Sequence, residues 1–118
     1  MDDRDRTCCE QAIVDGDKAL EYYGRVGKDW AKDEMVADAI VKRIESFCEY
    51  IGNVSDPEQA QHPEFLWRQV QGIRNRLAHA YHHTNVAVIQ EVLDEHLPRD
   101  LAAIRGWLPP PRSARTAR

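Results

Sequence analysis

Apolar residues along this chain recur at steps of three and four, the spacing of one face of an α-helix. A first helix is predicted over residues 3–26, with Gly24 and Gly27 bracketing its end. Ile13, Asp17, Leu20 and Gly24 lie mainly on one side of it.

A second helix begins at Asp29 or Asp33, which supply capping side chains, and ends before Gly52-Asn53. It carries the strongest amphipathic pattern of the chain, with Met35, Val36, Ala39, Ile40, Ile44, Phe47 and Cys48 in register.

The second half of the chain is divided by prolines. Residues 53–63 are polar and contain two prolines, which predicts a surface loop, and Pro63 suits the first position of a third helix. A fourth apolar stripe runs from Val86 to Leu97 after a Thr84-Asn85 cap signal. Pro98 is expected to break that stripe, so that a short last helix follows over residues 101–108.

The pattern as a whole predicts an all-α fold. No Asn-Gly or Asp-Gly turn lies between alternating runs, so nothing indicates a strand hairpin. We expect an up-and-down bundle of four to five helices forming one domain over residues 1–108. Residues 109–118 begin with three prolines and continue as a basic polar tail, which we expect to be disordered.

Composition narrows the class of protein. The 118 residues carry a net charge of −4, which argues against coating nucleic acid through bulk charge but is compatible with a local basic pocket. Cys8, Cys9 and Cys48 are odd in number and poorly spaced for disulfides, so reduced buried thiols are expected. The chain has neither a signal peptide nor a membrane-spanning run, which predicts a soluble cytoplasmic protein.

One segment, Arg74-Asn75-Arg76-Leu77-Ala78-His79-Ala80-Tyr81, stands apart from this generic composition. It combines a fixed cation, an amide, an imidazole and a phenol. An arginine can hold a phosphodiester, and an imidazole can move a proton near neutral pH. The set therefore favours RNA cleavage without a metal or cofactor, with His79 as general base on a 2′-hydroxyl and Arg74 on the phosphate.

Helical geometry qualifies this interpretation. Asn75 and His79 are four residues apart and share a face, whereas Arg74 and His79 are separated by about 140°. By spacing alone, a surface histidine beside solvated arginines is the commoner arrangement. The neighbouring His82-His83 pair does not predict a metal site, because adjacent imidazoles point to different sides of a helix.

The string Arg74-x4-His79-x-Tyr81 resembles the signature of HEPN-domain proteins, and more narrowly of the HepT family. The resemblance extends to the segment 33–45, to the tryptophan lead-in over residues 67–73, and to residues 85–98. It implies a homodimer with the cleft near the subunit interface, and a ribonuclease toxin acting through Arg74, Asn75 and His79. It also implies that a partner nucleotidyltransferase antitoxin attaches AMP to Tyr81, placing bulk and negative charge beside the RNA site.

The chain departs from that family at one place. Phe47-Cys48-Glu49-Tyr50 stands where the family usually has Ile-Gly-Glu-Ala, so the packing of the dimer is expected to differ. Glu49 is expected to form a structural salt bridge with Arg74 or Arg43, and Arg76 is a possible supporting cation. The alternative function is a non-catalytic helical subunit that binds a nucleotide or partner for a nucleotidyltransferase.

Overall fold

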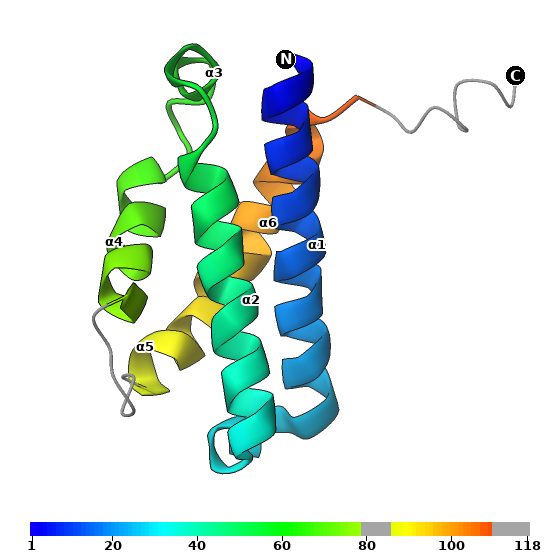
Figure 1. Ribbon diagram of the computed structural model, residues 1–118, viewed down its shortest axis with the longest axis vertical. Helices are drawn as coiled ribbons and strands as arrows, with labels where there is room; N and C mark the ends of the chain where they lie inside the picture. Colours follow the sequence, from blue (N-terminus) through cyan, green and yellow to red (C-terminus); the bar gives the residue numbers. More distant parts are fainter. Residues whose placement is uncertain (79–85, 110–118) are drawn as a thin grey trace, which may run out of the picture.

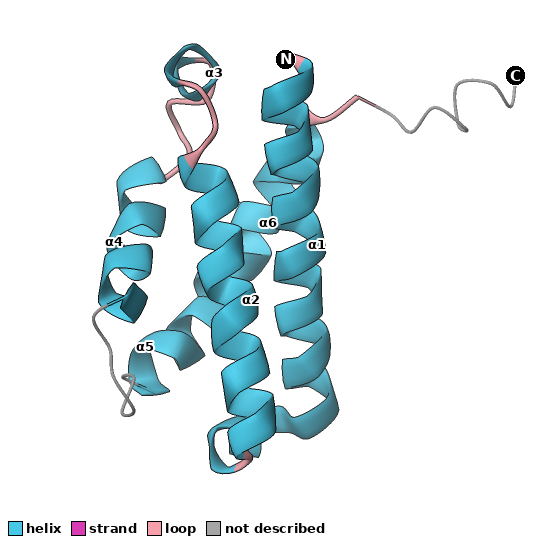
Figure 2. Ribbon diagram, viewed as in Figure 1, coloured by secondary structure: helices cyan, strands magenta, loops and turns pink. Residues whose placement is uncertain are grey.

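The structure, a computed structural model, describes residues 1–78 and 86–109 of the 118-residue chain. Every regular element in this described part is helical, which confirms the all-α prediction (Figure 2). The elements are α1 (Asp3–Val26), a 3-10 helix (Gly27–Lys32), α2 (Glu34–Gly52), α3 (Asp56–Ala60), α4 (Trp67–Ala78), α5 (Val86–Glu91), a π-helical turn (Val92–His96) and α6 (Leu97–Trp107).

The two long helices begin and end where the sequence predicts. The Asp2 side chain caps α1 by accepting a hydrogen bond from the backbone N–H of Asp5, and Gly27 ends the helix with a φ of 77°. That left-handed conformation favours glycine. Asp33, rather than Asp29, caps α2 by accepting from the backbone N–H of Val36.

α2 lies between α1 and α4, and α6 packs against α1 while passing behind the α1–α2 pair (Figure 1). The buried side of α1 consists largely of small residues and differs from the predicted side, since Asp17 and Gly24 are exposed and Ile13 and Leu20 lie only at the margin of the core. The small buried residues are Cys8, Cys9, Ala12, Gly16 and Ala19, and the aspartates Asp5 and Asp15 are buried beside them. Small side chains let neighbouring helices approach closely. A Cβ atom added at Gly16 would lie 2.7 Å from a methyl carbon of Leu101 on α6.

The segment between α2 and α4 corrects two expectations. Part of the predicted loop is the short helix α3, because Ser55 caps it by accepting from the N–H of Glu58 and Pro57 occupies its first turn. Pro63 does not begin the next helix; α4 starts at Trp67, whose indole N–H donates to the carbonyl of His62 at 2.9 Å. The intervening residues instead bring Phe65, Trp67 and Trp107 into ring contact.

Pro98 does not break the fourth apolar stripe. The chain remains helical from Val86 to Trp107, with Pro98 in the first turn of α6. The backbone N–H of Leu97 donates to the carbonyl of Val92, five residues back, which widens the helix into a π turn just before the proline. The helix therefore continues past the residue that lacks a donor.

All three cysteines are buried and free, as predicted. Burial raises the pKa of both Cys9 and Cys48 to about 12, so these are neutral thiols. The expected disordered tail lies, from residue 110 onward, outside the described residues. No helix in the described part is both long and apolar enough to cross a membrane.

Candidate active site

The candidate residues that the structure describes lie in the last turns of α4. Ile73 and Leu77 are buried, which fixes the rotation of this helix against the core. Arg74, Asn75 and Arg76 are consequently exposed. The other two members of the motif, His79 and Tyr81, lie outside the described residues.

The Arg74 side chain crosses from α4 to α2. Its guanidinium Nη2 lies 2.6 Å from a carboxylate oxygen of Glu49, so of the two partners predicted for Glu49 the structure contains Arg74. Arg43 instead donates to Asp15 on α1 at 2.8 Å. Arg74 is thereby held on the α2 side of α4, while the side chain of Asn75, the next residue along the helix, forms no hydrogen bond with any described residue.

A pocket of about 200 Å³ opens beside Arg74, between the end of α2, α3 and the first turns of α4. The floor of the pocket is formed by apolar side chains that are almost completely buried. These are Cys48, Ile51 and Val70, each at most 2% exposed. Its polar residues come from α3 and α4: Gln59, Arg68, Gln71 and Arg74. Sequence analysis missed this pocket. Only the i, i+3 spacing of Arg68, Gln71 and Arg74 on one helix face signals it.

The lining of the pocket is suited to contact with anions or planar polar groups rather than to nucleophilic chemistry. Cys48 in its floor is no nucleophile, because burial raises the pKa of its thiol to about 12. Arg68 forms no ion pair with any described residue, so its charge is available to a ligand. Arginine guanidinium groups suit phosphate and stack on planar groups.

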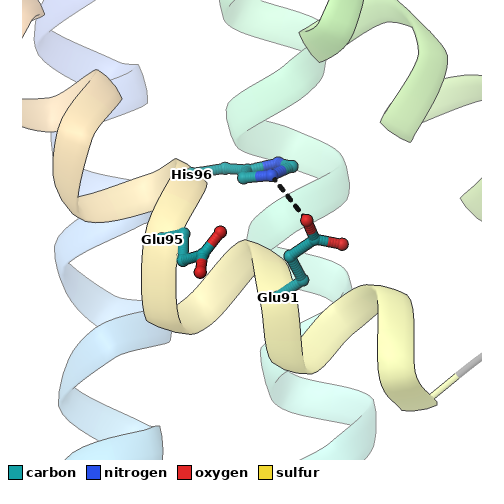
Figure 3. A group of neighbouring side chains, drawn as sticks. All are labelled: Glu91, Glu95 and His96. Carbon is teal, nitrogen blue, oxygen red and sulfur yellow. Dashed lines mark ion pairs between the residues drawn. The ribbon is translucent and has the colours of Figure 1, made fainter.

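A second group of side chains lies at the end of α5 and on the π turn, and none of them lines the pocket. Glu91, Glu95 and His96 place one potential ligand atom each within 4.8 Å of one another, and Nε2 of His96 lies 3.4 Å from Glu91 (Figure 3). In an α-helix, residues five apart are separated by about 140° around the axis. The π turn instead aligns Glu91 with His96, which the sequence pattern did not reveal. Both glutamates are exposed, and the cluster offers no fourth protein ligand among the described residues.

The sequence of the chain matches a known protein family. The family model described as "Ribonuclease HepT-like" matches residues 16–105. These residues include α2, α4, the whole Arg74–Tyr81 motif and most of α6. The chain belongs to the HepT-like ribonuclease family. The match covers most of the chain and confirms the resemblance seen in the motif.

Curated relatives carry names of the same kind. A protein of Caldanaerobacter subterraneus subsp. tengcongensis, provisionally named as an RNase, is 27% identical over 60% of this chain and 63% of its own length. One of Thermococcus cleftensis, provisionally named ribonuclease HepT, is 28% identical over 60% of this chain and 64% of its own length. The chain thus spans less than two thirds of the relatives that it matches. No solved structure matches it significantly.

Proposed function

We propose that this HepT-like protein is a metal-independent RNA endonuclease that acts as the toxin of a toxin–antitoxin pair. The observation that carries the proposal is the family match over residues 16–105, which contains the complete Arg74–Tyr81 motif. The relatives' names, which describe RNases, support the same activity. The exposed guanidinium of Arg74 beside a polar pocket supplies a place for a phosphate.

The proposed chemistry needs only side chains. His79 accepts the proton of a ribose 2′-hydroxyl, and the resulting oxygen attacks the adjacent phosphorus. Arg74 stabilises the charge that develops on the phosphate oxygens, and Asn75 orients His79 or a phosphate oxygen. The bond to the 5′-oxygen then breaks and that oxygen takes up a proton. The products are a 2′,3′-cyclic phosphate and a 5′-hydroxyl.

Expression of the chain alone tests this activity. Growth and RNA integrity are scored together for the wild type, His79→Ala and Arg74→Ala. We expect the wild type to stop growth and cut RNA, and both variants to lose both effects. Exposed Lys42 on α2 lies outside the motif, and Lys42→Ala serves as the matched control. Unchanged toxicity and cleavage in His79→Ala would refute the catalytic assignment of His79, whereas a wild type that cuts no RNA would favour the non-catalytic partner-binding function.

Two further measurements test the mechanism with purified protein. EDTA is expected to leave cleavage unchanged, and an RNA carrying a single 2′-deoxynucleotide is expected to resist cleavage at that position. Loss of activity in EDTA would exclude the metal-independent mechanism. Cleavage at the 2′-deoxy position would exclude attack by the 2′-hydroxyl.

The proposal extends to control of the toxin. A partner nucleotidyltransferase attaches AMP to the Tyr81 hydroxyl, and the added negative charge and bulk repel RNA from the neighbouring Arg74 site. Intact mass after incubation with the nucleotidyltransferase and ATP is expected to rise by at least one AMP, and Tyr81→Phe is expected to remain unmodified. An unmodified wild-type protein under these conditions would refute this control.

We also propose that the active form is a homodimer, in which a second copy of the motif lies opposite the first. A dimer gives Arg74 of one subunit a route to His79 of the other that one helix does not provide, because the two residues are about 140° apart around its axis. Sedimentation of the purified chain measures the mass directly. Full cleavage activity in a monomeric sample would contradict the proposal.

A further inference from the structure

The pocket beside Arg74 is too small for a length of nucleic acid and large enough for one planar group. Its volume of about 200 Å³ lies below the roughly 300–1,000 Å³ of pockets that enclose drug-sized ligands. Its apolar floor and polar sides are the two surfaces that a nucleobase needs, one for its ring face and one for its hydrogen-bonding edge.

The described side chains fit such a ligand in detail. Trp67 lines the pocket and is itself held by its hydrogen bond to the carbonyl of His62 and by ring contact with Trp107. Gln59 donates its Nε2 to the carbonyl of Val54 at 2.9 Å, which fixes its amide with the oxygen left as an acceptor. The Gln71 side chain makes no hydrogen bond with another described residue and offers both donor and acceptor.

The position of the pocket determines which nucleotide along the RNA strand places its base there. Arg74 both lines the pocket and pairs with Glu49, at the point where the proposed reaction holds the scissile phosphate. A base entering the pocket therefore belongs to a nucleotide that adjoins this phosphate. Arg68, the other cation of the pocket, is available to the next phosphate along the strand.

We propose that this pocket holds a nucleobase flanking the scissile phosphate, and that Gln59 and Gln71 read its edge and give the enzyme a base preference at the cut. The inference rests on the proposed ribonuclease function and adds a specificity site to it. RNA is recognised in this way when single-stranded bases are splayed out into pockets and hydrogen-bonded at their edges.

A pocket-filling substitution gives the sharpest test. Gly52 lines the pocket, and a Cβ atom added there meets no other atom within 4 Å, so the side chain of Gly52→Leu begins in open space at the pocket wall. Gly24 on α1 has equally open surroundings and does not line the pocket, which makes Gly24→Leu the matched control. Neither position needs a positive φ.

The first measurement is cleavage of single-stranded RNAs that differ only in the nucleotide on either side of the cut. The wild type and Gly24→Leu are expected to prefer one base about 10-fold over the others, which is the scale of one buried base contact. Gly52→Leu is expected to lose the preference, and Gln71→Ala to change it. Equal cleavage next to all four bases by the wild type would overturn the proposal while leaving the ribonuclease function intact.

The second measurement is binding, which does not depend on catalysis. Fluorescence anisotropy of short labelled RNAs, intact or abasic at one position, is recorded with the His79→Ala protein and with the same protein carrying Gly52→Leu or Gly24→Leu. One abasic position is expected to weaken binding about 10-fold, except in the Gly52→Leu protein. If the wild type cuts no RNA but this difference persists, the catalytic proposal fails and the base pocket stands. Loss of the difference in all three proteins overturns the pocket.

Discussion

The two sides of α2 carry similar ion pairs in opposite surroundings. Toward α1, Arg43 donates to Asp15 at 2.8 Å, and the Asp15 side chain is only 8% exposed. Toward α4, Arg74 lies 2.6 Å from Glu49, and the two side chains are 47% and 53% exposed. The same chemical pairing therefore serves different purposes on the two faces of one helix.

Burial decides the difference. A carboxylate taken out of water is costly unless a cation and hydrogen bonds compensate it, so Asp15 needs Arg43 for the fold to be stable. A pair that remains half in water contributes little to stability and separates easily. Glu49 thus positions Arg74 through a weak ion pair that a phosphate can replace.

The largest expected effect separates the two arginines by activity. Arg74→Ala should lower RNA cleavage by about 100-fold or more, because a cation aimed at developing charge is lost. Its free energy of unfolding should change by less than about 1 kcal/mol, since the pair with Glu49 is exposed. Gel-based cleavage rates and urea unfolding measure the two quantities. A large loss of stability with normal cleavage would reverse the comparison.

Arg43→Ala should show the opposite pattern. Removing it leaves the buried Asp15 without its cation, and the free energy of unfolding should fall by about 2–4 kcal/mol. Cleavage per folded molecule should stay unchanged. Adding Asp15→Asn should restore part of the stability, because no buried charge then remains. Urea unfolding of the single and double variants checks this, and no recovery in the double variant would contradict it.

The close contact of α1 with α6 predicts the next effect. Gly16→Ala should lower the free energy of unfolding by about 1–3 kcal/mol, because the new methyl group would lie 2.7 Å from Leu101. Gly24→Ala, on the exposed part of the same helix, should instead stabilise the protein by about 0.5–1 kcal/mol through helix propensity. Thermal or urea unfolding of both variants is the measurement. Equal effects at the two positions would disprove the contact.

A second buried carboxylate, Asp5, adds a dependence on pH. Burial alone would raise the pKa of Asp5, but hydrogen bonds from the side chain and backbone of Ser55 outweigh it and hold the pKa below its usual value of 3.8. A lowered folded-state pKa gives stability that is present above pH 3.8 and is lost as pH falls through the folded pKa. Asp5→Asn should therefore cost about 1–3 kcal/mol at pH 7 and progressively less in acid.

Asp100 provides a contrast of opposite sign. Burial raises its pKa despite the nearby Arg99 and His96, so its charged form is disfavoured in the folded protein. The free energy of unfolding of Asp100→Asn, compared with that of the wild type, should therefore increase as pH rises through that raised pKa. Urea unfolding at pH 7, at pH 4 and below pH 3.8 distinguishes the two aspartates, because the effect of Asp5 changes only in the most acidic range. If the stability of both variants changed with pH in the same way, the opposite pKa shifts assigned to Asp5 and Asp100 would be wrong.

The smallest effect is expected at the α4 side of α2. Glu49→Gln removes the charge of the exposed partner, and the free energy of unfolding should change by less than about 0.5 kcal/mol. Added salt should make the difference between the wild type and the variant smaller still, because it screens the exposed pair. A change above about 1 kcal/mol would mean that this exposed pair stabilises the fold as the buried Arg43–Asp15 pair does, and the contrast between the two pairs would fail.

The helices most accurately predicted from the sequence are those with explicit boundary residues. Asp33 before α2 and Gly27 after α1 mark boundaries by local chemistry that neighbouring segments do not change. The predictions that Pro63 begins a helix and that Pro98 breaks one were wrong, because a proline is compatible with more than one local structure. The inner side of α1 also escaped prediction, since Gly16 and its small neighbours carry little hydrophobic signal but allow the closest packing.

By itself, the sequence determined the helical class, the main helix boundaries near their caps and the motif that carries the family resemblance. These depend on local propensity and on residue types at short spacing. The tertiary structure alone decided which arginine pairs with which acid, that α2, α3 and α4 enclose a pocket beside Arg74, and that a π turn aligns Glu91 with His96. Those outcomes depend on the relative rotation of helices and on how a proline is accommodated, which are fixed only when the whole core packs.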